Sequence, residues 1–299
     1  MVKVNLTTNL ILLFLKILKK LRLIDKFNFY VKKYHNGKSY ALPIDSGLGL
    51  SSYIIKEDWL DQLIFLFKTS EIDNSFVDVG VNTGQTLLRL KSVNKDFEYL
   101  GFEPNSSCVH YVKKLVKMNN FTNCTVFCTA LSNKVDILSL GKSTISDQSA
   151  SVVSELRPNY FSESDDILSF DYDSFFRDKK IDLVKIDVEG AELEVISGMK
   201  YSIMDWKPII ICEVLDAYSL DALNFTQVRA NKLCELLEEL DYKIIHLETN
   251  KVNDLIVRFT KVDEFIINLW SNNSYYLNDY IFCPSECIDL VVSKLNFVL

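Results

Sequence analysis

The 299-residue chain lacks both an excess of positive charge and a long apolar run. Its formal net charge is −7, whereas a general nucleic-acid-binding protein normally presents a basic face, so we expect no nucleic-acid partner. The uninterrupted apolar stretch near the N-terminus, residues 10–15, is much shorter than the roughly 20 residues that a membrane-spanning helix needs. The sequence therefore predicts no helix that crosses a bilayer.

The N-terminal segment also lacks the order of a secretory signal peptide. Its clustered cations follow the apolar stretch instead of preceding it; they are Lys16, Lys19, Lys20 and Arg22. Their helical spacing predicts a basic amphipathic helix over residues 10–24. Two kinds of contact suit such a helix: packing on its own core or on a second copy of the chain, and peripheral contact with an anionic membrane surface.

Neither the cysteines nor the histidines form a framework. Seven cysteines make an odd count without regular spacing, and the three histidines are scattered. Cys212 lies in the apolar run PIIICEV, where a free cysteine behaves as a small hydrophobe. Cys283 and Cys287 have no second pair or nearby histidine to complete a metal site, so we expect no metal there. These features favour a reducing, cytoplasmic location.

What the chain does have is an alternation of strand-like and helix-like segments. Residues 27–44 predict a hairpin around Asn36 and Gly37. The segments that follow are expected to be helices at 57–68, 108–118, 191–199 and 229–240, and strands beginning at 76 and at 97–103, 125–130, 181–187, 208–214, 242–247 and 279–283. Such βαβ alternation predicts an open, mostly parallel sheet in one domain, residues 53–299, preceded by an extension over residues 1–52. The polar, serine-rich segment 136–170 is interpreted as an insertion that carries substrate contacts.

The sequence FVDVGVNTGQTLLRL, residues 76–90, predicts a strand that runs through a glycine-containing turn into a helix. It has neither the G-x-G-x-x-G of a dinucleotide-binding loop nor the lysine of a phosphate-binding loop. The acid Asp78 disfavours a pyrophosphate and favours a cation, and S-adenosylmethionine carries a sulfonium, an ammonium and one carboxylate. Gly80 and Gly84 would let the backbone approach this ligand, and the helix starting near Thr83 would offer amides to its carboxylate.

Two later strands end on residues that suit the same ligand. In YLGFEPN, Glu103 stands at a strand end, where an acid can accept both hydroxyls of a ribose. The sequence ALSN, residues 130–133, follows the third strand at a position that suits contact with an adenine edge. Solvated acids also end strands without any function, so the hypothesis depends on the combination of these features with the glycine loop.

A cluster of charged residues is expected at the end of the fourth and fifth strands. LVKIDVEGAELEVISGM, residues 183–199, places Asp187 and Glu189 after a strand, and PIIICEV adds Glu213 at the adjacent one. Several carboxylates in one place are costly unless a positive group compensates them. Lys185 supplies one such group, and a sulfonium ligand or a polar substrate would supply another.

Taken in order, FVDVGVNTGQ, FEPN, ALSN, KIDVEGAELEVISG and PIIICEV resemble the FkbM family of S-adenosylmethionine-dependent methyltransferases. The similarity extends over residues 53–282 and is most specific at KIDVEGAE, while Val81 stands where the family often has alanine. The resemblance implies the class I methyltransferase fold, a Rossmann-like, doubly wound α/β sheet of seven strands, mostly parallel with one antiparallel strand near the C-terminus. The strands at 242 and 279 would then pair beside the strand at 208.

The resemblance also implies roles for individual residues. The cofactor S-adenosyl-L-methionine would be bound by Asp78, Gly80, Asn82, Gly84 and Glu103, with Ser132 near its adenine. The methyl-transfer centre would be lined by Lys185, Asp187, Glu189 and Glu213. Members of the family methylate hydroxyls, often on sugars or polyketide-like products, so a sugar, glycan or secondary metabolite is the expected acceptor.

Methyl transfer needs an acceptor oxygen aligned about 3 Å from the methyl carbon and a route for its proton. No histidine lies near the motifs, so Asp187 or Glu189 is the candidate base, and direct loss of the proton to water is the alternative. A divalent cation held by Asp187 and Glu213 is a further alternative.

Two other functions compete with methyl transfer. Asp171 and Asp173 form a D-x-D pattern that a sugar-nucleotide glycosyltransferase would use to hold a metal. The sequence after Asp173, SFFRD, instead predicts that this residue is a helix N-cap. The second competitor is a non-catalytic scaffold that binds S-adenosylmethionine, which would leave the acids at the strand ends without a purpose.

Overall fold

The computed structural model describes residues 10, 13, 15–17, 20–21, 28–45, 47–54, 57–67, 75–143, 149–271, 274–297 and 299. Its centre is an eight-stranded sheet in the order β12-β11-β13-β10-β9-β3-β4-β5. The strands are β3 (Ser75–Val79), β4 (Glu98–Phe102), β5 (Cys124–Phe127), β9 (Leu183–Ile186), β10 (Ile209–Glu213), β11 (Tyr242–Thr249), β12 (Ile256–Val262) and β13 (Asp279–Pro284). Each strand predicted for this sheet is present, with ends that differ by a few residues.

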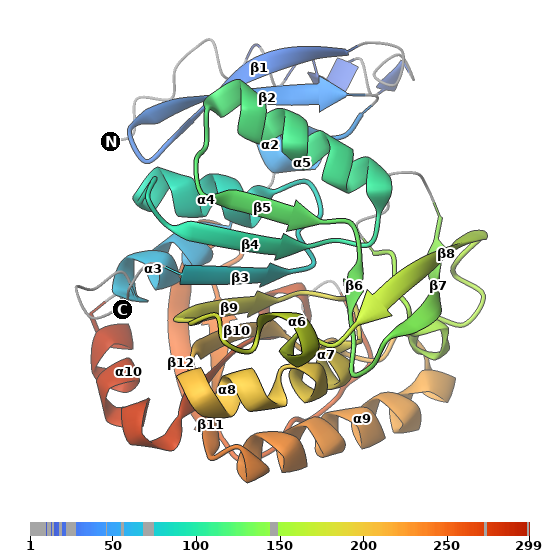
Figure 1. Cartoon of the computed structure of the whole chain (residues 1–299), viewed down its shortest axis with the longest axis vertical. Helices are drawn as coiled ribbons and strands as arrows, with labels where there is room; N and C mark the ends of the chain where they lie inside the picture. Colours follow the sequence, from blue (N-terminus) through green and yellow to red (C-terminus); the bar gives the residue numbers. More distant parts are fainter. Residues whose placement is uncertain are drawn as a thin grey trace.

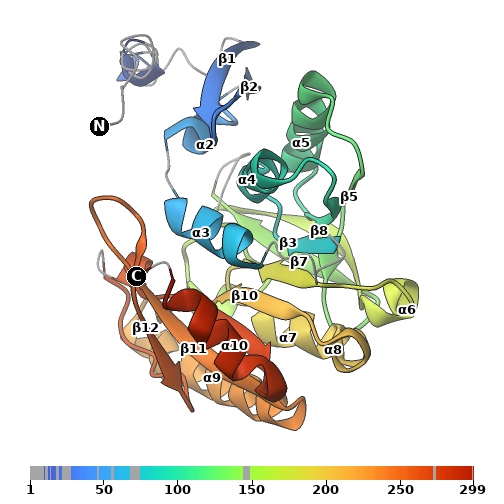
Figure 2. The ribbon, with the colours of Figure 1, turned by 90° about the vertical axis from the view of Figure 1, so that its left-hand side faces the viewer.

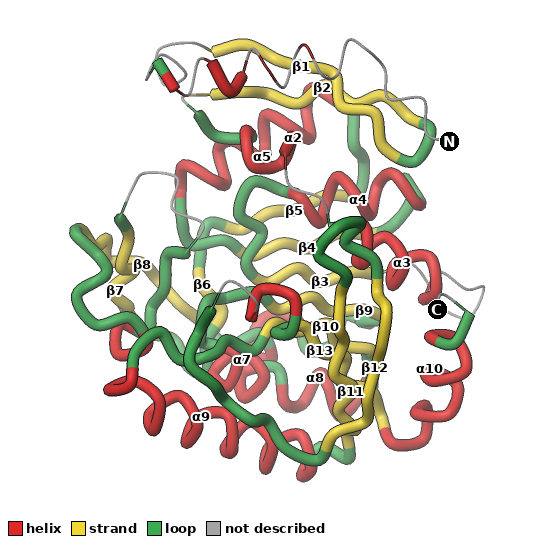
Figure 3. The backbone as a smooth tube through the Cα atoms, turned by 180° about the vertical axis from the view of Figure 1, so that it is seen from behind, coloured by secondary structure: helices red, strands yellow, loops and turns green. Residues whose placement is uncertain are grey.

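The sheet departs from the seven-stranded prediction at one edge. Strands β5, β4, β3, β9 and β10 are parallel, and β13 is inserted antiparallel between β10 and β11. These strands and β11 make the predicted seven, but β12 adds an eighth that pairs antiparallel with β11 (Figure 3). Most β12 side chains are exposed or half-buried, so this edge strand carries little of the apolar signal on which the prediction relied.

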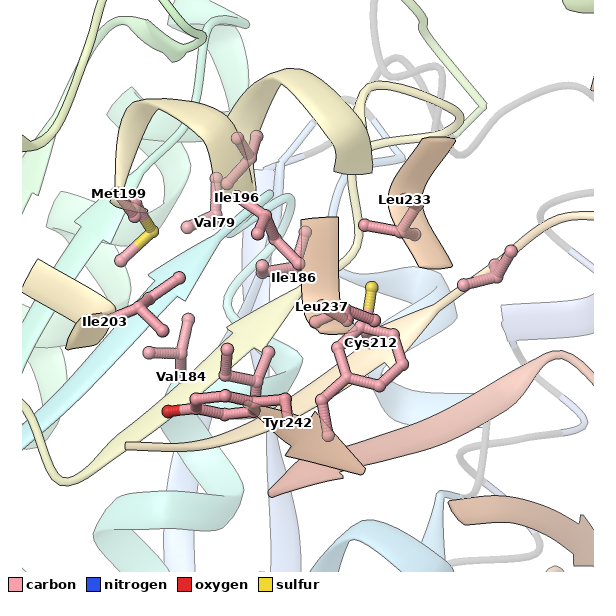
Figure 4. Packing of buried hydrophobic residues seen from close by; sticks show 14 of the residues in the cluster. Val79, Val184, Ile186, Ile196, Met199, Ile203, Cys212, Leu233, Leu237 and Tyr242 are labelled. Atoms are coloured by element: carbon pink, nitrogen blue, oxygen red, sulfur yellow. The ribbon is translucent and has the colours of Figure 1, made fainter. Parts of the chain in front are cut away.

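Helices cover both faces of the sheet, as the βαβ alternation predicts (Figures 1 and 2). One face packs against α7 (Glu192–Gly198), α8 (Lys200–Trp206) and α9 (Leu220–Glu239), and the other against α3 (Asp58–Phe67), α4 (Gln85–Val93), α5 (Ser106–Asn119) and α10 (Ile288–Leu295). The strands are buried on both sides: in β9, Val184 and Ile186 face α7 and α8 while Leu183 faces the opposite layer (Figure 4). Helix α9 begins nine residues before the predicted start because Ser219 caps it by accepting the amide of Ala222.

The predicted hairpin is confirmed as β1 (Asn28–His35) and β2 (Lys38–Asp45). Asn36 and Gly37 form its two-residue turn, and both have positive φ. The hairpin lies against α5 (Figure 1), where the Asn119 amide bonds both the N–H and the C=O of Ala41 at 2.8 Å. The domain boundary at residues 52 and 53 stays a prediction, and α2 (Leu50–Ile54) spans it.

Segment 136–170 is more regular than its serine-rich composition indicates. It contains β7 (Asp136–Lys142), the 3-10 turn η2 (Ser154–Leu156) and β8 (Glu163–Phe170), and these two strands form a small sheet with β6 (Ala130–Leu131). This sheet projects beyond the end of the large one (Figure 1). Ladder hydrogen bonds between β7 and β8 supply the order that the sequence pattern does not reveal.

The capping role predicted for Asp173 is wrong in detail. It is Asp171 that accepts the amide of Ser174 and so caps α6 (Asp173–Phe176), at 2.8 Å. Asp173 accepts the amides of Tyr201 and Ser202 at 2.8 and 2.9 Å and thereby caps α8, a helix 28 residues further along the chain. A local pattern cannot show such a contact, because it depends on how α6 and α8 pack.

The N-terminal segment 10–24 is described only in part. Residues 10, 13, 15–17 and 20 are helical, and the remainder of the predicted helix lies outside the described residues. Leu15 is fully buried against the hairpin and α5, whereas Leu13 and Ile17 are exposed. Within the described part of the chain, no helix combines the length and the apolar character needed to traverse a bilayer.

Candidate functional site

A cavity of about 930 Å³ opens at the carboxyl ends of the parallel strands. This is the edge of a doubly wound sheet at which ligands bind. Seven of the ten site residues predicted from the sequence line it: Gly80, Asn82, Glu103, Lys185, Asp187, Glu189 and Glu213. They come from four different strand ends, so the fold brings together residues that are up to 133 positions apart in the sequence.

The loop after β3 contains positive φ angles, which only a few residue types adopt readily. Gly80 has φ +92°, and a Cβ there would overlap the backbone carbonyl oxygen of Asp187. Asn82 has φ +49°, a conformation that asparagine accepts more readily than most residues. The loop therefore runs directly beside the strand end that carries Asp187.

Glu103 connects the loop after β3 with the loop after β4. Its carboxylate accepts the backbone amide of Asn82 at 2.7 Å and that of Asn105 at 2.8 Å, one on each oxygen. Burial raises the pKa of Glu103 to about 7, in spite of these two amides. Each oxygen keeps a lone pair for a further donor, and the side chain borders the cavity.

Asp78 lies beneath the loop and does not line the cavity. It is fully buried; the Tyr99 hydroxyl donates to its Oδ2 at 2.5 Å, and Oδ1 has no partner. Burial raises the pKa of Asp78 to about 7, although the Lys185 ammonium on the neighbouring strand opposes this shift. Asp78 can therefore act on the site through the loop and Lys185, not by touching a ligand in the cavity.

Gly84 and Ser132 likewise lie behind the cavity wall. A Cβ on Gly84 would be 3.2 Å from Leu115, so this glycine permits close packing between the loop and α5. Ser132 is buried, and its backbone amide bonds the carbonyl of Phe170 at 3.0 Å. The residues of ALSN that reach the cavity are instead Ala130 and Leu131.

Ionisable side chains at the ends of three neighbouring strands also line the cavity. Lys185 Nζ is 2.7 Å from Asp187 Oδ2. The two residues are two positions apart at the end of β9, so their side chains lie on the same side. Although burial opposes it, the ammonium of Lys185, together with a hydrogen bond from Glu213, holds the pKa of Asp187 below its usual value. Burial and the charge of Asp187 raise the pKa of Glu213 well above its usual value. Asp187 is therefore the more acidic member of the pair and loses its proton before Glu213 does.

The sequence reasoning missed Asp279, which completes this group. It is the cross-strand partner of Glu213, because β13 runs antiparallel and begins at the edge where β10 ends. Burial raises the pKa of Asp279 to about 8. The predicted strand at 279–283 contained the necessary signal, since an antiparallel strand places its first residue at the ligand edge.

Glu189 is held by the insertion. Its carboxylate forms an ion pair with the buried guanidinium of Arg157, and its carbonyl accepts the Ser151 hydroxyl at 2.7 Å. Glu189 has φ +55°, and the adjacent Gly190 would clash with Leu156 if it carried a Cβ. The insertion therefore fixes the turn after β9 from the outside, and Arg157 is the one arginine in the segment 136–170.

Two aromatic residues at the cavity were also missed. Tyr218 and Trp270 line the cavity and stack on each other. Both lie in loops, where no periodic pattern marks them.

Among the described residues, no group of three or more His, Cys, Asp or Glu side chains is arranged to hold a metal ion.

Comparison with known proteins gives three kinds of match. The family model described as the methyltransferase FkbM domain matches residues 78–244. The beauvericin nonribosomal cyclodepsipeptide synthetase of Beauveria bassiana is 30% identical over 84 residues, which make up 28% of this chain and 2% of the synthetase. The chain therefore spans only a small fraction of that relative.

Solved structures align with lower sequence identity. The methyltransferase FkbM of Methylobacillus flagellatus KT aligns with a TM-score of 0.44 and 17% identity over 70% of this chain and 43% of that one. An O-methyltransferase of Bacillus cereus, solved in complex with SAH, aligns with a TM-score of 0.43 and 10% identity over 76% of this chain and 80% of that one. The family model, which matches more than half of the 299 residues and includes both the glycine loop and the fourth strand end, carries the assignment. The chain belongs to the FkbM domain family of methyltransferases.

Proposed function

We propose that this methyltransferase uses S-adenosyl-L-methionine and transfers its methyl group to a hydroxyl of a sugar, a glycan or a secondary metabolite. One observation carries the proposal: a single cavity is lined both by Gly80, Asn82 and Glu103 and by Lys185 and Asp187. The first group suits a nucleoside, and the second suits a reacting centre.

The residues present fit this cofactor. Asn82 Oδ1 is buried without a hydrogen-bond partner in a side chain that lines the cavity, so it offers an acceptor to a bound ligand. Glu103 offers two carboxylate oxygens to ribose hydroxyls. When bound, S-adenosylmethionine supplies a methyl group activated by the sulfonium. We assign Asp78, Gly84 and Ser132 an indirect part, because they shape the walls behind the cavity.

Asp187 is the residue that suits the acceptor proton. It is ionised and borders the cavity, and it accepts hydrogen bonds from Lys185 and Glu213, two groups through which a proton can be passed on. Its low basicity suits a reaction in which the hydroxyl proton leaves late, as the leaving group departs. Glu213 and Lys185 set the charge state of Asp187, while the ion pair with Arg157 withholds Glu189 from proton transfer.

The glycosyltransferase alternative has no support in the structure. Asp171 and Asp173 cap two helices, and neither lines the cavity. Calorimetric titration of the protein with SAH and, separately, with UDP-glucose tests the choice. We expect SAH to bind with micromolar affinity and UDP-glucose to give no heat. Binding of UDP-glucose without SAH would overturn the proposed function.

We further propose that the N-terminal helix contacts an anionic lipid surface. The described apolar residues that it exposes are Leu10, Leu13, Ile17 and Leu21, which recur at helical spacing. Lys16 and Lys20 are exposed beside them. Flotation with vesicles containing phosphatidylserine should recover the protein, and vesicles of phosphatidylcholine alone should not. A Leu13→Ser, Ile17→Ser variant that floats equally well would contradict this, and a dimer by sedimentation would assign the stripe to a second copy.

A further inference from the structure

Tyr218 and Trp270 form an aromatic pair at the cavity. Their ring centroids are 5.8 Å apart with an interplanar angle of 16°, which is an offset stack. Tyr218 is 36% exposed and Trp270 is 42% exposed, although both line a cavity in the protein. Trp270 stacks on one side of Tyr218 and Arg157 lies over the same ring, so Trp270, the more exposed of the two, offers the apolar surface for a ligand.

The backbone holds this pair in place before any ligand arrives. The Ala217 amide donates to Asn268 at 2.9 Å, and the Trp270 amide donates to the Ala217 carbonyl at 2.8 Å. The Gln227 side chain donates to the carbonyl of Phe265 at 2.8 Å and accepts the amide of Ile267 at 3.0 Å. The loop that carries Tyr218 is thus bonded to the loop that carries Trp270, and the second loop is also bonded to α9. The aromatic pair is therefore a preorganised surface.

Arg157 connects this surface to the reacting centre. Its guanidinium carbon lies 4.1 Å from the centroid of the Tyr218 ring, and Nη2 donates to the Tyr218 hydroxyl at 2.5 Å. The same guanidinium forms the ion pair with Glu189 and donates to the carbonyl of Ser149 at 2.6 Å. A ring that stacks on the pair is therefore held at a fixed distance from the turn that follows Asp187.

The charges around the cavity restrict what that ring can carry. Seven carboxyl side chains line the cavity, against two cationic side chains, Lys185 and Arg157. Both cations are already bonded to carboxylates, those of Asp187 and Glu189. An acceptor with a phosphate or carboxylate near its ring would find no free cation among these lining residues to compensate its charge. Neutral hydroxyl groups, in contrast, can donate to the carboxylates.

We propose that Tyr218 and Trp270 are the acceptor-binding surface, and that they select a hydroxylated ring that carries no anionic group. This inference rests on the proposed function, because it names the acceptor side of the same cavity. Arg157 is a positioning residue that acts through Tyr218 and Glu189. The acceptor ring stacks on the aromatic pair while its hydroxyls point toward the carboxylates.

Saturation-transfer NMR on the SAH-loaded protein tests the proposal. The probes are methyl glycosides of glucose, galactose, mannose, fucose and rhamnose, three uncharged polyphenols, and the methyl glucuronide and galacturonide that match two of the sugars. We expect ring-proton signals from at least one neutral probe, and from no acid probe above one fifth of that intensity. Whether the sugars or the polyphenols respond distinguishes the two sources of such a ring.

Two variants make the test specific. Trp270→Ala should abolish the signal and Trp270→Phe should restore most of it, while the SAH affinity of both stays within twofold of the wild type. Phe175→Ala is the matched control, because Phe175 is 62% exposed and does not line the cavity. An acid probe that binds as well as a neutral one, a signal retained in Trp270→Ala, or no neutral signal from protein that binds SAH would overturn the inference and leave the proposed function intact. Failure to bind SAH would overturn the proposed function and the inference with it.

Discussion

Single residues set the geometry of the loop after β3, which we propose to bind the cofactor, and the glycines show how. Gly80 and Gly37 both have positive φ, +92° and +74°. A Cβ on Gly37 would meet nothing within 4 Å, whereas one on Gly80 would overlap the carbonyl of Asp187. The sequence marks both positions as turns, but only the packing of β3 against β9 distinguishes a replaceable glycine from one that is not.

Gly80→Ala should therefore cost much more than Gly37→Ala. The shared conformational strain is about 1 kcal/mol for an alanine at positive φ, and the overlap at position 80 should bring its total to roughly 3 kcal/mol or more. Urea unfolding measures both costs, and calorimetry with SAH should show binding lost only in Gly80→Ala. Equal losses of stability in the two variants would contradict the close approach.

If Glu103 binds the ribose as proposed, cofactor binding depends on pH. The pKa of this carboxyl is about 7, so acidification below that value converts an acceptor of two ribose hydroxyls into a neutral acid. SAH affinity should fall as the pH is lowered from 8 to 5.5, approaching tenfold per pH unit at the acid end. Glu103→Gln should bind more weakly and lose this slope. Calorimetric titrations at four pH values provide the measurement.

Glu192 is the matched control for this experiment. Burial raises its pKa to about 7 as well, but its side chain does not line the main cavity and accepts the amide of Gly190 at 2.8 Å. Glu192→Gln should retain the wild-type pH slope of SAH binding. A flat slope in this variant would show that the dependence comes from the fold and not from Glu103.

Asp187→Asn should damage turnover and spare binding. We expect kcat to fall by about 10²-fold or more, the range for loss of a proton acceptor, and the SAH dissociation constant to change by less than about twofold. Glu189→Gln should cost less in kcat, because the Arg157 ion pair already occupies that carboxylate. Transfer of label from tritiated S-adenosylmethionine to an accepted probe measures both. A larger loss of kcat in Glu189→Gln than in Asp187→Asn would make Glu189, and not Asp187, the proton acceptor.

Helices and strands were predicted well where they are periodic and long, and less well where tertiary contacts form them. The β7–β8 sheet has a serine-rich sequence and pairs through backbone hydrogen bonds, and β12 is an exposed edge strand. At this scale, apolar periodicity reports the burial of one face. Elements that bury little give no such signal, even when they form a wall of the cavity.

Asp171 and Asp173, the D-x-D pair, are predicted to stabilise helices α6 and α8. Asp173→Ala removes the acceptor of two α8 amides and Asp171→Ala that of one α6 amide. Loss of a cap costs about 1 kcal/mol. Both variants should therefore unfold at lower urea concentrations than the wild type, with Asp173→Ala the more affected. SAH affinity and methyl transfer should be unchanged. Abolished transfer in a folded Asp171→Ala variant would revive a catalytic D-x-D.

Over the whole molecule, buried acids make the fold favour low pH. Five carboxyls have pKa values of about 7 or 8 because burial raises them, namely those of Asp78, Glu103, Glu189, Glu192 and Asp279. In the unfolded chain they titrate near 4, so between pH 4.5 and 7 the folded state binds more protons. Raising the pH through this window should therefore lower the free energy of unfolding.

Urea unfolding of the protein without cofactor at pH 5, 6, 7 and 8 checks this expectation. The urea midpoint should decrease steadily, and Glu192→Gln should reduce the slope by up to about 1.4 kcal/mol per pH unit, the contribution of one titrating group. A midpoint that rises with pH would contradict it. Because SAH affinity is expected to increase over the same interval, the pH that suits the cofactor is one at which the empty fold is less stable.

The sequence by itself determined the alternation of strands and helices, the family, and seven residues that line the cavity. It could do so because strand ends of a parallel sheet share one edge, so residues such as Glu103 and Asp187 meet wherever the strands are placed in order. The tertiary structure alone decided that Asp78 lies beneath the loop, that Arg157 holds Glu189, and that Tyr218 stacks on Trp270. Those contacts join side chains from different strands and loops, and their energy arises only when packing brings the side chains together.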